Sequence, residues 1–470
     1  MQYRLESDSV GEKRIPKDAY YGVQSLRAHE NFMITGRKVH KEMIKALAEV
    51  KKAAAMTNMQ IELLSKKIGN AIVKACDEIV EGKLEEQFIT DPIQGGAGTS
   101  MNMNLNEVIA NRAIEILGGE KGDYSIVHPN DHVNMGQSTN DVIPTGGKIA
   151  TIRLLDRALV SLQNLVDALT DKSKEFDHVI KMGRTQMQDA VPIRLGQEFR
   201  AYSNAIKRDL VRIKRAKEEL YHVNIGATAI GTGINADEQY VENITPNLSK
   251  VTALDLIQCE DLVDGTQNLD CFASVSSNLK VCALSLSKIA NDLRLMSSGP
   301  RTGFGEINLP AKQNGSSIMP GKVNPVIAEV VNQVAFSIVG NDVTITMAVE
   351  AGQLELNAFE PVLYYKLFES IETLKNGVDT FIDNCIKDIT ANEERCKKLV
   401  DNSVGIITAI CPHVGYKKAA KVAKTAIQTG ESVKELVLKE NLLSEKELDT
   451  ILDPFGMTEP GISGKELLKK

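Results

Sequence analysis

The sequence predicts a mainly α-helical protein built around a central bundle of five long helices. Apolar residues recur at intervals of three and four over stretches of about thirty residues, which is the spacing of one helix face. Few segments between these stretches have the character of strands. Aromatic residues make up only 4% of the chain and Trp is absent, so the core must be aliphatic, as suits long packed helices.

The five long helices are expected at residues 145–176, 193–221, 264–296, 325–349 and 357–395. In the first of them a run of thirty residues would span about 45 Å. Its apolar face consists of Ile149, Ile152, Leu155, Leu159, Leu162, Val166 and Leu169. The fourth, which starts at Pro325, is apolar on more than one face, and such a helix is buried all round. Because one subunit could hardly cover it, we expect a homo-oligomer.

At 470 residues the chain is too long for one hydrophobic core, and three domains are expected. The first, residues 1–141, is mixed but mainly helical, with helices from Lys41 and from about Asn104. Residues 142–396 form the central long-helix domain. Residues 397–470 form a small helical C-terminal domain.

Composition narrows the possible classes of protein. A net charge of −7 argues against a nucleic-acid surface, which would require a basic face. The start of the chain lacks the apolar core of a signal peptide, and no run of about 18 apolar residues predicts a membrane span. Seven scattered cysteines without a C-x-x-C pair indicate free thiols in a reducing cytoplasm, with Cys271 and Cys282 buried in a helix. The seven histidines form no ligand-spaced cluster, so a zinc site is not expected. No other metal and no cofactor is expected either.

The segment from Asn314 to Asn324 has the features of an anion-binding lid. Asn324 is expected to cap a helix with Pro325 at its first position, so that free N–H groups and the positive dipole end face the loop. Lys322 adds a cation at the same place. Ser316 and Ser317 lie between glycines, which let the backbone approach a ligand closely. Read alone, the segment is more typical of an ordinary Gly/Ser/Pro connection.

Three further polar segments could bind the same ligand. One is glycine-rich and ends in Thr99; another, Ser138-Thr139-Asn140, precedes a long helix; the third holds Thr185 and Gln186 between two long helices. Taken singly, each is accounted for by turn and capping chemistry.

Together these segments resemble one known family. The run Gly-Ser-Ser-Ile-Met-Pro-Gly-Lys-Val-Asn, ending at Asn324, is similar to the signature of the fumarase/aspartase superfamily, whose enzymes eliminate across the Cα–Cβ bond of a succinyl group to give fumarate. The other three segments resemble its substrate loops. Residues 15–24, 27–32 and 354–362 resemble the aspartase branch. The resemblance implies the three-domain lyase fold and a homotetramer with active sites shared between subunits.

The resemblance also implies a reaction, the reversible elimination of ammonia from L-aspartate to give fumarate through an enediolate. Ser316 would be the base on a mobile loop, and spacing alone does not choose it over Ser317. Neutral donors and one cation would hold the developing negative charge without a metal. The implied substrate-binding residues are Thr99, Ser138, Thr139, Asn140, Thr185, Gln186, Ser317, Lys322 and Asn324.

Two alternatives stay open within the superfamily. A class II fumarate hydratase would share every loop, but Gln186 stands where fumarases are expected to carry His, and a hydroxide leaving group benefits from an acid. A non-catalytic scaffold, as in lens crystallins, would be marked by an altered Ser316 loop, which here matches in full. The Gly231–Ala236 run fits a dinucleotide pattern, but no clear βαβ unit or parallel sheet accompanies it.

Overall fold

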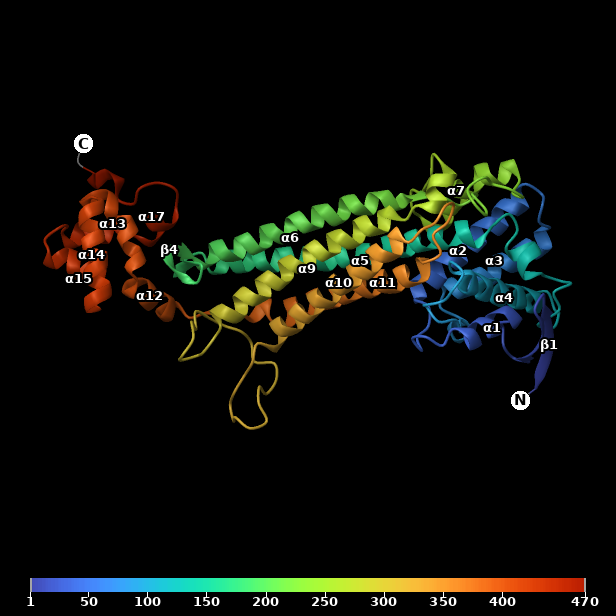
Figure 1. Ribbon diagram of the computed structural model, residues 1–470, viewed down its shortest axis with the longest axis horizontal. Helices are drawn as coiled ribbons and strands as arrows, with labels where there is room; N and C mark the ends of the chain where they lie inside the picture. The colour runs from blue at the N-terminus through green and yellow to red at the C-terminus, as the bar shows by residue number, and fades with distance from the viewer. Residues whose placement is uncertain (1, 469–470) are drawn as a thin grey trace. The chain divides into compact units, whose positions relative to one another are not determined.

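The computed structural model describes residues 2–468 and is mainly helical, as predicted (Figure 1). Its contacts divide the chain into two compact units. Unit 1 contains residues 1–160, 209–283 and 335–375, and unit 2 contains residues 161–208, 284–334 and 376–470. The predicted domain boundaries after residues 141 and 396 fall inside helices, so the three-domain division stays a prediction.

The predicted five long helices are present, and each contributes residues to both units. They are α5 (Thr139–Glu175), α6 (Leu195–Glu218), α9 (Asp270–Met296), α10 (Val326–Glu350) and α11 (Glu360–Asn384). α5 begins before the predicted residue 145 and includes Pro144, which cannot donate to the carbonyl of Asn140. That carbonyl instead accepts a hydrogen bond of 3.1 Å from Asn224 Nδ2.

Two other helix boundaries were predicted wrongly. The stretch predicted from residue 264 is broken at Asn268, so the short helix α8 (Leu262–Gln267) precedes α9. α11 was predicted to continue to residue 395, but it ends at Asn384. The chain then forms β8 (Thr390–Ala391), which pairs with β7 (Ile307–Asn308) and therefore cannot stay helical.

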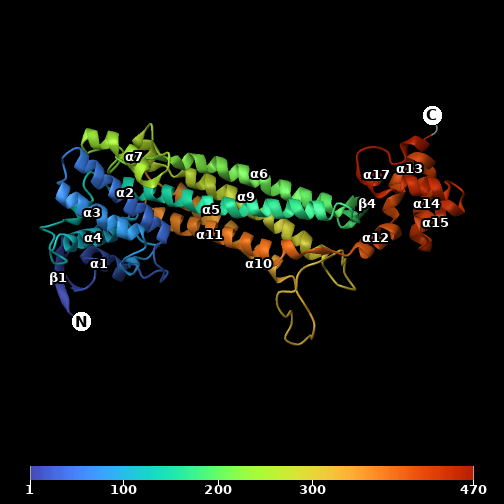
Figure 2. The same ribbon diagram turned by 180° about the vertical axis from the view of Figure 1, so that it is seen from behind.

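Unit 1 holds the N-terminal elements (Figure 2). Strands β1 (Tyr3–Asp8) and β2 (Gly11–Pro16) form an antiparallel hairpin. The helices that follow are α1 (Val23–Asn31), α2 (Lys41–Gln60), α3 (Lys66–Val80), η1 (Glu85–Gln87), α4 (Thr99–Ile116) and the π-helical turn η2 (Pro129–Val133). α3 was not predicted, although its start is capped by the Ser65 side chain. α4 begins earlier than the predicted Asn104.

Unit 1 also contains the short elements between residues 219 and 267. They are η3 (Glu219–Tyr221), β5 (His222–Val223), α7 (Glu238–Thr252), β6 (Ile257–Gln258) and α8. β5 and β6 pair in parallel, so the expectation that no parallel pairing accompanies the Gly231–Ala236 run is wrong. Each of the two strands is only two residues long. α7 begins at Glu238, after the Gly231–Ala236 run has ended, so the run does not lead directly into a helix as a dinucleotide-binding turn would. At Gly231 a Cβ would lie 2.3 Å from the Val263 backbone, so close chain packing explains this glycine.

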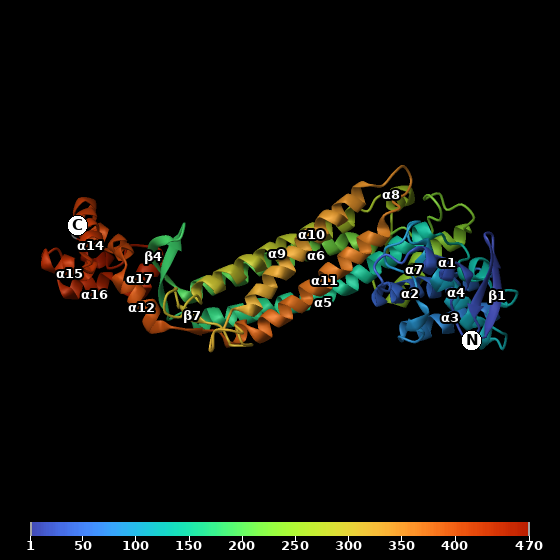
Figure 3. The ribbon, with the colours of Figure 1, turned by 60° about the horizontal axis from the view of Figure 1, so that its bottom comes forward.

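Unit 2 contains a hairpin and the C-terminal helices (Figure 3). β3 (Ile180–Thr185) and β4 (Gln188–Arg194) are antiparallel, with a bulge between Met182 and Arg184. The C-terminal elements are η4 (Ile386–Asp388), α12 (Glu393–Asn402), η5 (Val404–Ile406), α13 (Ile407–Val414), α14 (Tyr416–Thr429), α15 (Val433–Lys439), α16 (Glu445–Ile451), α17 (Pro454–Thr458) and η6 (Lys465–Leu467). Their apolar core includes Met182, so the hairpin packs into it.

α10 is less buried in one chain than its composition predicts. Val330, Phe336, Val343 and Met347 are 38%, 66%, 57% and 67% exposed. Among the described residues, α10 is the one helix whose length and composition would allow it to cross a membrane, although no such span was predicted. This is weak evidence for a span, because the core helix of a soluble protein meets the same criteria. The seven cysteines are free thiols, and Cys271 and Cys282 are buried on α9 as predicted.

Candidate active site

The Asn314–Asn324 segment is a loop with a closed neck. The Gly315 N–H donates to the Lys322 carbonyl at 2.7 Å, and Asn324 Nδ2 donates to the Gly315 carbonyl at 2.7 Å. The prediction that Asn324 caps the following helix is therefore wrong, because its side chain closes the loop instead. α10 starts at Val326, just after Pro325.

Ser316 differs from Ser317 in its hydrogen bonds. Its Oγ accepts from the backbone N–H groups of Ile318 at 3.2 Å and Met319 at 3.0 Å. The Ser317 hydroxyl is exposed and has no hydrogen bond within residues 2–468. N–H donors aimed at a hydroxyl oxygen stabilise the alkoxide over the alcohol. The loop geometry thus distinguishes two serines that sequence spacing could not.

Lys322 and Asn324 line a cavity of about 970 Å³ together with Arg294, Ser297 and Ser298. The Lys322 side chain is exposed, and no described residue forms an ion pair with it. Arg294 is held by the Asn332 Oδ1 atom at 3.2 Å. The cavity is also lined by Glu329, whose carboxylate lies 4.0 Å from Arg294 and offsets its charge. Lys322 is therefore the cation here that can attract an anion, with neutral donors around it.

Thr185 and Gln186 form the tip of the β3–β4 hairpin. Thr185 pairs with Gln188, so Gln186 and Met187 make a two-residue turn with φ values of 52° and 64°. Positive φ at both positions is what such a turn requires, and it is costly for residues other than glycine. Both Thr185 and Gln186 are exposed at this tip.

Thr99 is the first residue of α4. Its Oγ1 donates to the Gly96 carbonyl at 2.6 Å, so its lone pairs remain available to a ligand N–H. Gly98, at φ 90°, precedes it, and a Cβ there would lie 3.0 Å from Ile143 of α5. Glycine is thus needed to bring the start of α4 close to α5.

Asp141 anchors the Ser138–Asn140 turn, in which Ser138 immediately precedes α5 and Thr139 and Asn140 are the first two residues of the helix rather than a segment before it. Its fully buried carboxylate accepts from the Ser138 N–H at 2.9 Å and from the N–H groups of Gly226 and Thr228 at 3.1 Å each. Burial raises the pKa of Asp141 to about 6, although the backbone N–H groups oppose this. Asn140 Nδ2 also donates to the Ala229 carbonyl at 2.7 Å.

Sequence reasoning missed the buried polar layer in contact with this turn. Lys51 of α2 is fully buried and donates to Asn134 Oδ1 at 2.7 Å. Asn102 donates to the same oxygen at 3.2 Å and to Thr139 Oγ1 at 3.4 Å. Burial lowers the pKa of Lys51 to about 7. The sequence does contain a signal for this layer, because Lys51 lies one helical turn after Leu47, on the apolar face of α2.

The predicted site residues therefore fall into two groups. Thr99 and the Ser138–Asn140 turn belong to unit 1, where Asn102 joins α4 to Thr139. Thr185, Gln186 and the Asn314–Asn324 loop belong to unit 2. No described hydrogen bond joins the hairpin tip to that loop directly.

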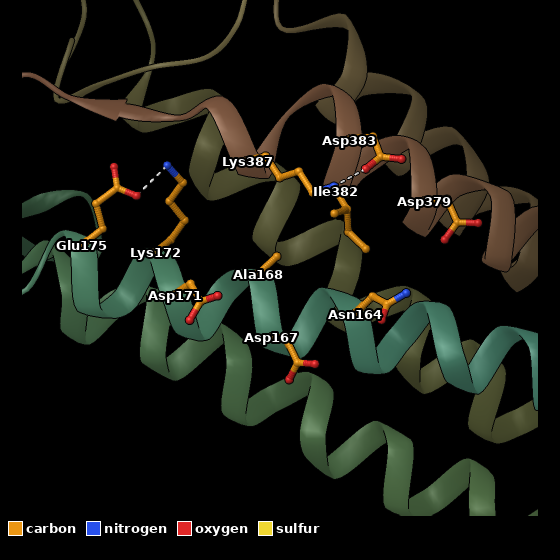
Figure 4. A pocket seen from close by; sticks show the side chains of 10 residues that line it. All are labelled: Asn164, Asp167, Ala168, Asp171, Lys172, Glu175, Asp379, Ile382, Asp383 and Lys387. Carbon is orange, nitrogen blue, oxygen red and sulfur yellow. Dashed lines mark hydrogen bonds and ion pairs between the residues drawn. The ribbon is translucent and has the colours of Figure 1, made fainter.

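Another pocket in unit 2 lies between α5 and α11 and contains none of the predicted residues (Figure 4). Its acidic side chains are partly neutralised, because Lys172 pairs with Glu175 at 2.9 Å and Lys387 with Asp383 at 2.6 Å. Within residues 2–468, no group of three or more His, Cys, Asp or Glu side chains is arranged to hold a metal ion.

Long bundled helices, a Gly-Ser-Ser loop and separate hydroxyl-bearing turns define a class of lyase, and comparisons with known proteins agree. Residues 11–340 match the family described as "Lyase", and residues 406–459 match "Fumarase C C-terminus". The chain belongs to this lyase family and is a carbon–nitrogen lyase.

Within the family the chain is more similar to ammonia-lyases than to a fumarase. It is 59% identical to the aspartate ammonia-lyase of Bacillus subtilis (strain 168), over 100% of this chain and 99% of that one. The crystal structure of a fumarate lyase:delta crystallin from Brucella melitensis bound to cobalt has a TM-score of 0.96 at 48% identity, covering 98% and 100% of the two chains. The recombinant class II fumarase from Schistosoma mansoni has a TM-score of 0.93 at 36% identity, with the same coverage.

Proposed function

We propose that the chain is an aspartate ammonia-lyase that converts L-aspartate reversibly to fumarate and ammonia, with Ser316 as the base. Full-length identity of 59% to an aspartate ammonia-lyase supports the reaction. The observation that carries the assignment of the base is the pair of backbone N–H groups on Ser316 Oγ. A serine is a poor base unless its alkoxide is stabilised, and these two donors supply that stabilisation.

In the proposed first step the Ser316 alkoxide removes the proton from Cβ of aspartate. The electron pair of the C–H bond moves into the adjacent carboxylate, which becomes an enediolate dianion. In the second step this pair forms the Cα–Cβ double bond, the C–N bond breaks, and ammonia leaves. The amino group of the bound aspartate is an ammonium, so the C–N electron pair goes to nitrogen and neutral ammonia leaves without help from an acid. Hydroxide is a poor leaving group that benefits from protonation, so Gln186 rather than a histidine at the hairpin tip is in keeping with loss of ammonia.

The other predicted residues would bind the substrate and the developing charge. Lys322 supplies the positive charge of the loop, and the hydroxyl and amide groups supply neutral donors with fixed directions. These groups are Thr99, Ser138, Thr139, Asn140, Thr185, Gln186, Ser317 and Asn324. No step of this proposal passes through a metal or a cofactor.

We further propose a cytoplasmic homotetramer whose active sites are shared between subunits. The support is the exposed apolar side of α10, where Phe336, Val343 and Met347 lie at positions i, i+7 and i+11 and so share one face of the helix. Contiguous exposed apolar surface of this kind marks an interface. Sedimentation of the purified protein should give the mass of four chains, and a monomer would contradict this proposal.

Two matched serine variants test the assignment of the base. Ser316→Ala should abolish fumarate formation from L-aspartate, measured by fumarate absorbance, and should leave the assembly intact. Ser317→Ala, which changes the neighbouring hydroxyl, should retain more activity because that hydroxyl lacks the N–H donors. Near wild-type turnover by Ser316→Ala would refute the base, and fumarate from L-malate without ammonia release would favour a hydratase.

A further inference from the structure

A buried ion cluster in unit 2 is not used in the chemistry proposed above. The Glu306 carboxylate is fully buried, with Oε1 2.8 Å from Arg184 Nη1 and Oε2 3.5 Å from Lys181 Nζ. Lys181 also donates to Glu198 Oε1 at 3.1 Å. The Arg184 guanidinium lies 4.1 Å from the centre of the Phe304 ring. The Arg184 fork is thus held between a carboxylate and an aromatic face.

The position of this pair in the chain relates it to two segments of the candidate site. Arg184 immediately precedes Thr185 at the hairpin tip. Glu306 immediately precedes β7, the strand from which the chain continues into the Asn314–Asn324 loop. The Arg184–Glu306 pair therefore connects two segments that share no direct hydrogen bond.

The segment around α12 contacts both sides of this connection. The Asn392 N–H donates to the Glu306 carbonyl at 2.9 Å, and Asn392 Nδ2 donates to the Gly305 carbonyl at 2.8 Å. On the hairpin side, Ser403 Oγ donates to Asp189 Oδ2 at 2.8 Å. The segment around α12 thus contacts both the β3–β4 hairpin, at Asp189, and the chain just before β7, at Gly305 and Glu306.

Stability alone does not explain a charge pair at this position. Taking Glu306 out of water costs free energy that its ion pairs only partly return, and apolar side chains of similar volume would often stabilise as well or better. Glu306 Oε2 in addition lacks a hydrogen bond. What the pair does supply is direction, since Arg184 Nη1 donates to Glu306 Oε1 at 2.8 Å and to the Met182 carbonyl at 3.3 Å while its planar guanidinium faces Phe304, so few orientations satisfy all three contacts.

We propose that Arg184 and Glu306 are positioning residues that set the place of Thr185 and Gln186 relative to the Ser316 loop. Neither touches the reacting atoms. The pair acts through the backbone, from Arg184 into the turn and from Glu306 through β7 into the loop. The catalytic consequence rests on the proposed function, whereas the mechanical connection does not.

The test compares two pairs of matched variants in the full-length protein. Arg184→Lys keeps the charge but loses the fork and the stacking on Phe304. Arg194→Lys is the control, because Arg194 also pairs with carboxylates (Asp177 at 3.3 Å and Glu459) and lies 5.0 Å from an aromatic ring, but at the far end of the hairpin. Arg184→Gln/Glu306→Gln removes both charges of the pair, whereas Glu306→Gln leaves Arg184 unpaired.

Hydrogen exchange of the backbone amides gives a result that does not depend on activity. In Arg184→Lys and Glu306→Gln, exchange should become faster both at residues 185–188 and at residues 314–324, and the control should change neither. Faster exchange at the hairpin without a change in the loop would overturn the connection, even if the wild type formed no fumarate.

Kinetics then separate positioning from stability. We expect kcat/KM for L-aspartate to fall about 100-fold in Arg184→Lys, since misplacing binding groups by about 1 Å costs that much. The double variant should regain thermal stability relative to Glu306→Gln without regaining kcat/KM. If kcat/KM instead follows the melting temperature across these variants, the pair is structural and the proposal is wrong.

Discussion

Gly315→Ala is the change whose effect can be worked out most directly from the structure. A Cβ on residue 315 would lie 2.6 Å from the Lys322 carbonyl oxygen and 2.9 Å from the Asn324 N atom. Both atoms belong to the backbone, so no side-chain rotation can relieve the contact. The neck of the loop must open, and the two hydrogen bonds of 2.7 Å that close it are lost or lengthened.

The size of the effect follows from these contacts. Two hydrogen bonds of ordinary strength represent roughly 1–3 kcal/mol of local stabilisation. Since residues 311–323 are mostly exposed, global unfolding should change little, and the melting temperature should stay close to that of the wild type. A displacement of Ser316 by about 1 Å would lower kcat/KM about 100-fold.

The assay is fumarate formation from L-aspartate, with thermal unfolding measured on the same samples. Gly321→Ala is the matched control, because Gly321 lies in the same loop at φ 79° and a Cβ there would contact nothing within 4 Å. It should cost about 1 kcal/mol of backbone strain and reduce activity much less. Wild-type kcat/KM in Gly315→Ala would show that the closed neck does not position Ser316.

Two further predictions concern buried carboxylates. Asp141→Asn should raise KM for L-aspartate and also lower the melting temperature. An amide cannot accept from all three N–H groups around Asp141, so the Ser138–Asn140 turn loosens. An unchanged KM would contradict this prediction. Burial raises the pKa of Glu360 from 4.5 to about 8, so the folded state keeps a proton that the unfolded chain releases, and stability is lost as the pH rises from about 4.5 to about 8. Glu360→Gln should reduce the slope of the unfolding free energy, measured in urea, against pH by up to about 1.4 kcal/mol per pH unit over this interval. An unchanged slope would show that the pKa of Glu360 is not raised in the folded state.

The elements that the sequence predicted well are those with a strong local pattern. The long helices follow from apolar residues repeated over 24 or more residues, and α2 begins at the predicted Lys41. α3 is shorter and was missed. The end of α11 was misplaced because pairing of β8 with β7, which lies some eighty residues earlier, overrides the helical pattern.

The same division holds for the candidate site. The identity of its loops could be read from short motifs, because each motif places a glycine and one or more hydroxyls within a short segment, to which the Ser316 loop adds Lys322. Which serine accepts two backbone N–H groups, and that Asn324 closes the loop rather than capping the helix, depended on the folded loop.

The sequence by itself thus determined the helical architecture, the polar segments and the family. Only the tertiary structure showed that Lys51 lies beside the Ser138–Asn140 turn and that Glu306 pairs with Arg184, across 122 residues of chain. The physical reason is that helix periodicity and turn chemistry are short-range. The burial of a charge depends instead on which distant segments pack around it, and this is settled only when the whole chain folds.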